Sequence, residues 1–155
     1  MDVDQVLPKL FVGSCPAGPA DVDRLRRDFA VTAVLNVQTE EDFQYIGLDW
    51  PELEDCYRRS GIEVRRVPVR DFDHEDLRRH LPACVDVLRE LIEQGHAVYV
   101  HCNMGMGRSP SVVIAYLHWV GQQDLDEAFG HVSRCRPCVP DLEAIRRAGE
   151  DRLRG

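Results

Sequence analysis

Two kinds of hydrophobic pattern alternate along the chain. Short apolar runs rich in β-branched residues are typical of buried strands, whereas apolar residues three and four positions apart indicate amphipathic helices. The predicted strands are residues 9–13, 31–37, 62–69 and 97–100. The predicted helices are residues 19–29, 74–94, 110–120, 125–135 and 140–153, with further helical fragments within residues 39–59.

Proline and glycine mark several of the expected boundaries. Pro19 stands at the start of its helix, and Gly95 closes the long helix that precedes it. Pro68 limits its strand to an edge of the sheet or to the strand's own end. Strands that alternate with helices predict an α/β fold, in which helices flank a central and mostly parallel sheet.

The length and composition favour one globular domain. The chain has 155 residues, of which 44% are hydrophobic and 30% charged, with no internal repeat, low-complexity stretch or linker. We therefore expect residues 1–155 to form a single domain, and we expect it to be a monomer.

Charge and targeting signals narrow the function classes. The 19 basic and 27 acidic residues leave a net charge of −8, which disfavours binding to nucleic acids and to anionic membranes. The first ten residues resemble neither a signal peptide nor a transit peptide, and no apolar run is long enough to span a bilayer. The six cysteines are scattered, unlike those of a secreted disulfide scaffold. These features predict a cytoplasmic protein, or a plastid protein if a transit peptide has been removed.

The segment HCNMGMGRSP, residues 101–110, carries the candidate chemistry. It places an arginine six positions after a cysteine, a spacing that is weak by itself because both residues are frequent in this chain. The context is more specific. A predicted strand leads into the segment, two glycines allow tight curvature, and a predicted helix follows.

We expect this segment to form an oxyanion cradle. Amide groups that converge at a helix N-terminus present partial positive charge to a dianion. Gly105 and Gly107 suit such a loop because other residues resist positive φ angles. Arg108 can bind two phosphate oxygens, and the same field favours the nucleophilic thiolate of Cys102. The expected phosphate-binding residues are Asn103, Met104, Gly105, Met106, Gly107 and Arg108.

Two neighbours of the nucleophile have expected supporting roles. Ser109 is placed to hydrogen-bond the thiolate and to stabilise it as a leaving group. His101 precedes the loop and is expected to hold its conformation through hydrogen bonds.

The proton donor for the leaving group is expected in residues 70–76, which lie between a predicted strand and a predicted helix. Asp71, Asp73 and Asp76 are all candidates. Asp73 and Asp76 stand near the helix start, where capping gives them another explanation. Asp71 is therefore the preferred general acid. It completes the expected catalytic set with Cys102, Arg108, Ser109 and His101.

These residues resemble the cysteine-dependent dual-specificity phosphatases, which carry HC-x5-RS in the C-terminal half of the domain and an acidic loop before it. Within that family the chain is similar to the plant glucan (starch) phosphatases and, more distantly, to laforin. The similar segments are FVGSCP, VLNVQTEEDFQYIGLDW, VPVRDFDHEDLRRHLP, YVHCNMGMGRSPSVVIAYLHWV and RPCVPDLEAIR. They cover nearly the whole chain.

The resemblance implies further substrate contacts and no metal or cofactor. Phe72 would be an aromatic platform for a glucose ring, Tyr45 would line the entrance to the same channel, and Met106 matches a long aliphatic residue of the family loop. Ile46 would also contact substrate, although plant members have an aromatic residue there. Met104 replaces a small alanine, which changes the pocket floor.

The expected function is removal of phosphate monoesters from a phosphorylated glucan. A loop without charged side chains suits a monophosphate on a neutral polymer, whereas phosphoinositides call for additional cations. The catalytic domain itself must hold the glucan, because we expect no carbohydrate-binding module. The alternatives are a protein phosphatase acting on phosphoserine, phosphothreonine or phosphotyrosine, a lipid phosphatase, and a catalytically silent binding module.

Other residues carry weaker signals. Cys135 and Cys138 form a C-x2-C pair that we interpret as structural. A redox partner for Cys102 could be Cys15, Cys56 or Cys84, and the sequence does not choose among them. His74 neighbours the acidic loop and could touch substrate.

Overall fold

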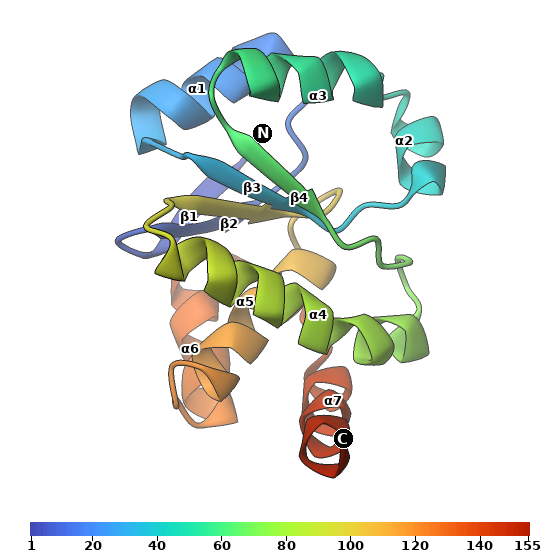
Figure 1. The fold of residues 1–155 in the computed structure, drawn as a ribbon. Coiled ribbons are helices and arrows are strands. Elements are labelled where there is room, and N and C mark those ends of the chain that lie inside the picture. The colour runs from blue at the N-terminus through green and yellow to red at the C-terminus, as the bar shows by residue number, and fades with distance from the viewer.

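A five-stranded sheet forms the centre of the computed structural model, which describes all 155 residues (Figure 1). The strands are β1 (Val3–Leu7), β2 (Leu10–Gly13), β3 (Ala33–Asn36), β4 (Glu63–Arg66) and β5 (Val98–His101). Their order across the sheet is β1-β2-β5-β3-β4. All neighbouring strands are parallel except β1, which runs antiparallel to β2. The predicted α/β fold with a mostly parallel sheet is confirmed.

Helices cover both faces of the sheet (Figure 1). One face carries α1 (Pro19–Phe29) and α3 (Trp50–Arg59), and α2 (Glu40–Ile46) lies between β3 and α3 in the chain. The other face carries α4 (His74–Glu93), α5 (Arg108–Trp119), α6 (Leu125–Cys135) and α7 (Leu142–Arg154). The sheet is thus the middle layer of three.

The strand residues divide between two hydrophobic cores because successive side chains point to opposite faces. Phe11, Val34 and Tyr99 belong to the core beneath α1 and α3. Their neighbours Leu35 and Val100 belong to the larger core beneath α4 and α5. Burial on both faces explains why these strands appear in the sequence as continuous apolar runs rather than alternating ones.

The structure adds one strand that the sequence analysis did not predict. β1 lies at an edge of the sheet and most of its residues are only partly buried, so its sequence VDQVL lacks a continuous apolar run. The predicted strand at residues 62–69 is confirmed as the other edge strand, but it ends at Arg66, two residues before Pro68. α5 begins at Arg108 rather than at residue 110, with Pro110 in its first turn.

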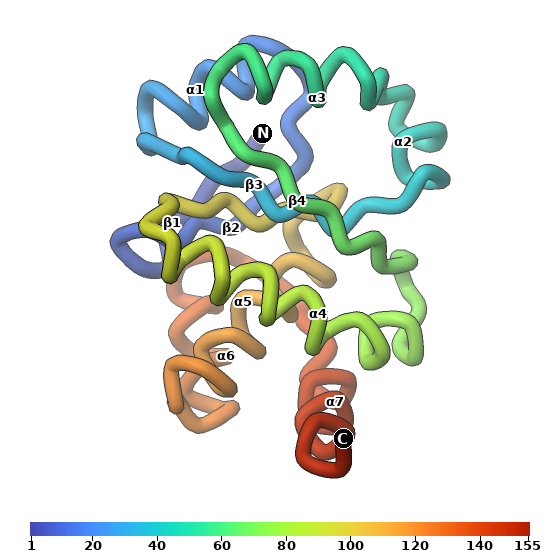
Figure 2. The backbone as a smooth tube through the Cα atoms, in the orientation of Figure 1, coloured from blue at the N-terminus to red at the C-terminus, as the bar shows by residue number.

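Strand register brings distant loops to one end of the sheet. His101 at the end of β5 pairs with Gly13 of β2 and with Asn36 of β3. The segments that follow β2, β3 and β5 therefore leave the sheet side by side (Figure 2). In α/β sheets this carboxyl end is where ligands bind.

Candidate active site

The loop between β5 and α5 curves tightly at one of its two glycines. Gly105 has a φ angle of +71°, and a Cβ atom there would overlap the backbone of Gly13. Glycine is required at this position on both counts. The expectation for Gly107 was wrong, since its φ angle is −116°, which does not require glycine.

The carbonyl groups of this loop are turned outward and held by the surrounding protein. Asn103 O accepts from the amide of Cys15 at 2.9 Å, and Met106 O accepts from the amide of Val139 at 2.7 Å. The carbonyls between them, of residues 104 and 105, accept from the guanidinium of Arg136 at 2.8 and 2.6 Å. The amides of residues 103–107 donate no hydrogen bond within the protein. These amides are therefore available to an anion.

Cys102 lies at the base of the loop and is 3% exposed. Its Sγ lies 3.2 Å from the hydroxyl oxygen of Ser109. His101 is fully buried, and burial lowers the pKa of its imidazole to about 4, so the ring is neutral near pH 7. Because a carbonyl oxygen can only accept, Nδ1 carries the ring proton and donates to the carbonyl oxygen of Cys102 at 3.0 Å. The structure thus brings His101 and Ser109 into contact with Cys102, as the sequence analysis expected.

Arg108 is buried at the start of α5 and has a partner that the sequence analysis missed. Its Nη1 donates to Asp42 Oδ2 and to the Val69 carbonyl oxygen, each at 2.7 Å. Its Nε is buried and has no partner in the protein. The guanidinium is thus held in place, and its Nε is a buried donor without a partner.

The carboxylate of Asp42 is itself held by hydrogen bonds from three residues, Arg108, Thr39 and Asn103. The Thr39 side chain and Asp42 form a capping box at the start of α2, and Asn103 Nδ2 donates to Asp42 Oδ1 at 2.9 Å. Burial alone would raise the pKa of this carboxyl group, but hydrogen bonds from Arg108, Thr39 and Asn103 lower it below its ordinary value. The T-x-x-D pattern could have located the helix start. No sequence signal pairs Asp42 with an arginine 66 positions away.

Asp71 also contacts the guanidinium, from the loop that enters α4. Its Oδ2 lies 3.2 Å from Arg108 Nη2. Asp73 caps α4 by accepting from the amide of Asp76, which in turn accepts from the amide of Arg70. The capping explanation is confirmed for Asp73 but not for Asp76, whose side chain accepts from a loop amide instead. Of the three candidate acids, only Asp71 contacts Arg108.

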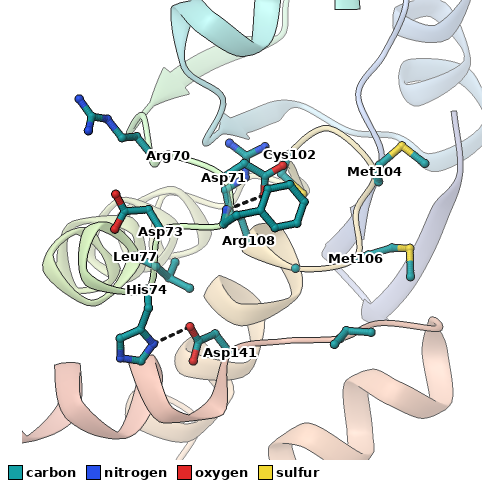
Figure 3. Close-up of a pocket in the computed structure, with 13 residues that line it drawn as sticks. Arg70, Asp71, Asp73, His74, Leu77, Cys102, Met104, Met106, Arg108 and Asp141 are labelled. Atoms are coloured by element: carbon teal, nitrogen blue, oxygen red, sulfur yellow. Dashed lines mark hydrogen bonds and ion pairs between the residues drawn. The ribbon is translucent and has the colours of Figure 1, made fainter. Parts of the chain in front are cut away.

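A main cavity of about 560 Å³ opens above Cys102 (Figure 3). Its lining residues are Arg70, Asp71, Phe72, Asp73, His74, Leu77, Cys102, Met104, Met106, Gly107, Arg108, Val139 and Asp141. A second cavity of about 470 Å³ shares residues 70–73 with it and is also lined by Thr39, Glu41, Asp42, Tyr45 and Asn103. The predicted nucleophile, arginine and acid thus border one cavity.

Two exposed aromatic side chains line these cavities. Phe72 is fully exposed on the segment that both cavities share, and Tyr45 is 88% exposed in the second one. Phe72 has a φ angle of +57°, which is unusual for an aromatic residue and typical of functional loops. Ile46 is exposed but lines neither cavity, and Met104 is exposed at the rim of the main one rather than at its floor.

Arg136 is the second functional residue that the sequence analysis missed. It lies within the C-x2-C segment, where only the cysteines attracted attention. Its buried side chain holds the loop carbonyls and also pairs with Asp4 of β1 at 2.9 Å. A basic residue between two cysteines gave no sign of this contact with the loop.

All six cysteines are free. No three His, Cys, Asp or Glu side chains are grouped as metal ligands, and no helix combines the length and apolar character needed to cross a membrane.

Sequence comparison places these features in a family. The family described as "Dual specificity phosphatase, catalytic domain" matches residues 10–146. The chain is 40% identical to phosphoglucan phosphatase DSP4, amyloplastic, of Castanea sativa, with 97% of this chain and 40% of that protein covered. It is 36% identical to phosphoglucan phosphatase LSF1, chloroplastic, of Arabidopsis thaliana (94% and 24% covered) and 35% identical to mouse laforin (97% and 49%). The chain spans less than half the length of each of these relatives.

Solved structures share the fold of this chain. The crystal structure of PTPMT1 superposes with a TM-score of 0.78 at 22% identity, covering 99% of this chain and 98% of that one. Human DUSP28 gives a TM-score of 0.75 at 29% identity, covering 97% and 98%. The chain belongs to the dual-specificity phosphatase family.

Proposed function

We propose that this chain hydrolyses phosphate monoesters of phosphorylated glucans through a phosphocysteine intermediate. The observation that carries the proposal is the pairing of an anion cradle with exposed aromatic side chains along two adjoining cavities. The printed names of two relatives, phosphoglucan phosphatases DSP4 and LSF1, support the same substrate class.

In the first step, the thiolate of Cys102 attacks phosphorus. An S–P bond forms as the bond between phosphorus and the sugar oxygen breaks, and Asp71 gives its proton to that oxygen. Arg108 and the free loop amides bind the phosphoryl oxygens as charge develops in the transition state. The oxygen of Ser109 stabilises sulfur in its anionic form.

In the second step, a water molecule replaces sulfur on phosphorus. Asp71, now a carboxylate, accepts a proton from the water as the oxygen attacks. The S–P bond breaks and its electrons return to Cys102 as the thiolate. The products are the dephosphorylated sugar and inorganic phosphate, and the proton that Asp71 takes from the water returns the enzyme to its starting state.

The charge distribution supports a neutral polymer over a substrate with several phosphates. Glu41, Asp42, Asp71 and Asp73 line the second cavity, and Arg70 is its only basic residue. Carboxylates at this density repel additional phosphate groups. Phe72 and Tyr45 offer apolar faces on which the C–H faces of sugar rings can pack.

The experiment compares substrates at equal enzyme concentration. Phosphate release is measured from phosphorylated amylopectin, phosphorylated glycogen and phosphopeptides containing serine, threonine or tyrosine phosphate. We expect the glucans to be preferred, and Phe72→Ala to lower glucan turnover more than turnover of a small aryl phosphate. A preference for phosphopeptides would overturn the glucan proposal and favour the alternative, a protein phosphatase. The oligomeric state and the compartment of this chain stay predictions.

A further inference from the structure

A histidine–aspartate contact on the wall of the main cavity has no role in the steps above. His74 Nδ1 lies 2.7 Å from Asp141 Oδ2. Both residues line the main cavity together with Asp71 and Cys102. Figure 3 shows the imidazole turned from the start of α4 towards the carboxylate. The contact joins two segments that are 67 positions apart in the chain.

Asp141 ends a segment that supports the catalytic loop. We call residues 136–141 the strap. The strap holds the loop through the Arg136 side chain and through the amide of Val139, as described above. At its end, the amide of Asp141 donates to Ser111 Oγ at 3.0 Å, and that hydroxyl donates to the carbonyl oxygen of Gly107 at 2.8 Å. The strap is therefore fixed relative to the phosphate-binding loop.

Asp141 is also fixed in orientation. Its Oδ1 accepts from the amide of Ala144 and caps α7, which leaves Oδ2 for His74. A carboxylate held by its own helix makes a rigid acceptor.

The segment that carries the acid has fewer supports. Phe72, directly after Asp71, is in the left-handed region and its side chain is fully exposed. The side chain of Asp71 contacts the Arg108 guanidinium and the amide of Phe72. His74 is the first residue of α4, three positions after Asp71. Its contact with Asp141 therefore ties the end of the acid segment to the strap.

We propose that the His74–Asp141 contact is a positioning device that holds Asp71 in register with the phosphate-binding loop for proton transfer to the leaving oxygen. The inference rests on the proposed function, in which Asp71 is the general acid. His74 acts through Asp71 and does not itself exchange a proton with the substrate.

The test uses leaving groups of different basicity. p-Nitrophenolate departs readily without a proton, whereas phenolate needs one, so a displaced acid slows phenyl phosphate hydrolysis selectively. The kcat/KM values for phenyl phosphate and p-nitrophenyl phosphate are measured for each variant. The measured quantity is the ratio of kcat/KM for phenyl phosphate to kcat/KM for p-nitrophenyl phosphate. Loss of folded enzyme lowers both values by the same factor and leaves this ratio unchanged.

The expected results are specific for each substitution. His74→Ala lowers kcat/KM for phenyl phosphate about tenfold more than for p-nitrophenyl phosphate, a fraction of the 10²–10⁴-fold that a general acid contributes. Asp141→Ser keeps a good helix cap but is too short to reach His74, and it gives the same selective loss. The double variant loses no more than either single variant because both remove one contact. His74→Asn, whose Nδ2 can still donate to Asp141, restores part of the ratio.

Two further variants serve as references. Arg78→Ala removes another polar link between α4 and α7, the pair with Asp151 at 2.8 Å outside the cavities, and should leave the ratio unchanged. Asp71→Asn should lower the ratio more than any other variant. If Asp71→Asn lowers it but His74→Ala and Asp141→Ser do not, the positioning inference is overturned and the proposed function stands. If Asp71→Asn does not lower it, the acid assignment fails and the inference fails with it.

Discussion

Arg108 contacts two aspartate side chains in different surroundings. Asp42 is nearly as buried as the guanidinium, whereas about a third of the side chain of Asp71 is exposed. Removing one member of a buried ion pair leaves a charge without compensation, while an exposed pair gains little because water screens it. The stability effects of removing the buried and the exposed partner of the same arginine can therefore be compared directly.

We predict that Asp42→Asn lowers the free energy of unfolding by about 3 kcal/mol and that Asp71→Asn lowers it by less than about 1 kcal/mol. Urea unfolding of the two variants and the parent protein measures both values. Asp71→Asn should instead lower the rate of the chemical step, since it removes the acid from an enzyme that stays folded. Equal destabilisation by the two substitutions would contradict the role given to Asp42.

At the scale of the element, the catalytic loop depends on one glycine more than on the other. Gly105 combines a positive φ angle with close contact to β2, whereas Gly107 has a negative φ angle and space for a Cβ atom. A methyl group at residue 105 must displace the loop from Gly13. A displacement of about 1 Å at a catalytic centre can cost about a hundredfold in rate.

Gly105→Ala is accordingly expected to lower kcat/KM about a hundredfold and to destabilise the fold by about 1–3 kcal/mol. Gly107→Ala is the control for stability and should change the free energy of unfolding by no more than about 1 kcal/mol. Steady-state kinetics and thermal unfolding of both variants provide the measurements. A stable and fully active Gly105→Ala enzyme would show that the loop does not need this conformation.

The elements were predictable where one local pattern determines them. The Pro19–Phe29 and Leu125–Cys135 helices have the predicted bounds because each has its own apolar face and boundary residues. β1 was not predictable from its own residues, because its strand conformation comes from pairing with β2 at the sheet edge. The conformation of an edge strand of this kind depends on tertiary pairing, which the residues of the strand itself indicate only weakly.

At the scale of the whole molecule, the residues of the site also divide into those that the sequence could predict and those that it could not. Cys102, Arg108 and Ser109 could be predicted because they lie in one short segment, the loop after β5 and the first turn of α5, where spacing and conformation are local. Asp42 and Arg136 could not, because each reaches the loop from a distant segment and makes its contact only in the folded chain. The acid lies between these cases, since its position before α4 was informative but its approach to Arg108 is a tertiary contact.

The most direct test of the account is detection of phosphate on Cys102 during turnover. Asp71→Asn enzyme is mixed with p-nitrophenyl phosphate, quenched in acid at short times and digested, and the peptides are analysed by mass spectrometry. Because this leaving group needs little protonation and the second step lacks its base, the intermediate should accumulate. The account predicts one phosphoryl group on the peptide that contains Cys102. Phosphate on any other residue, or continued turnover with Cys102 never modified, would contradict it.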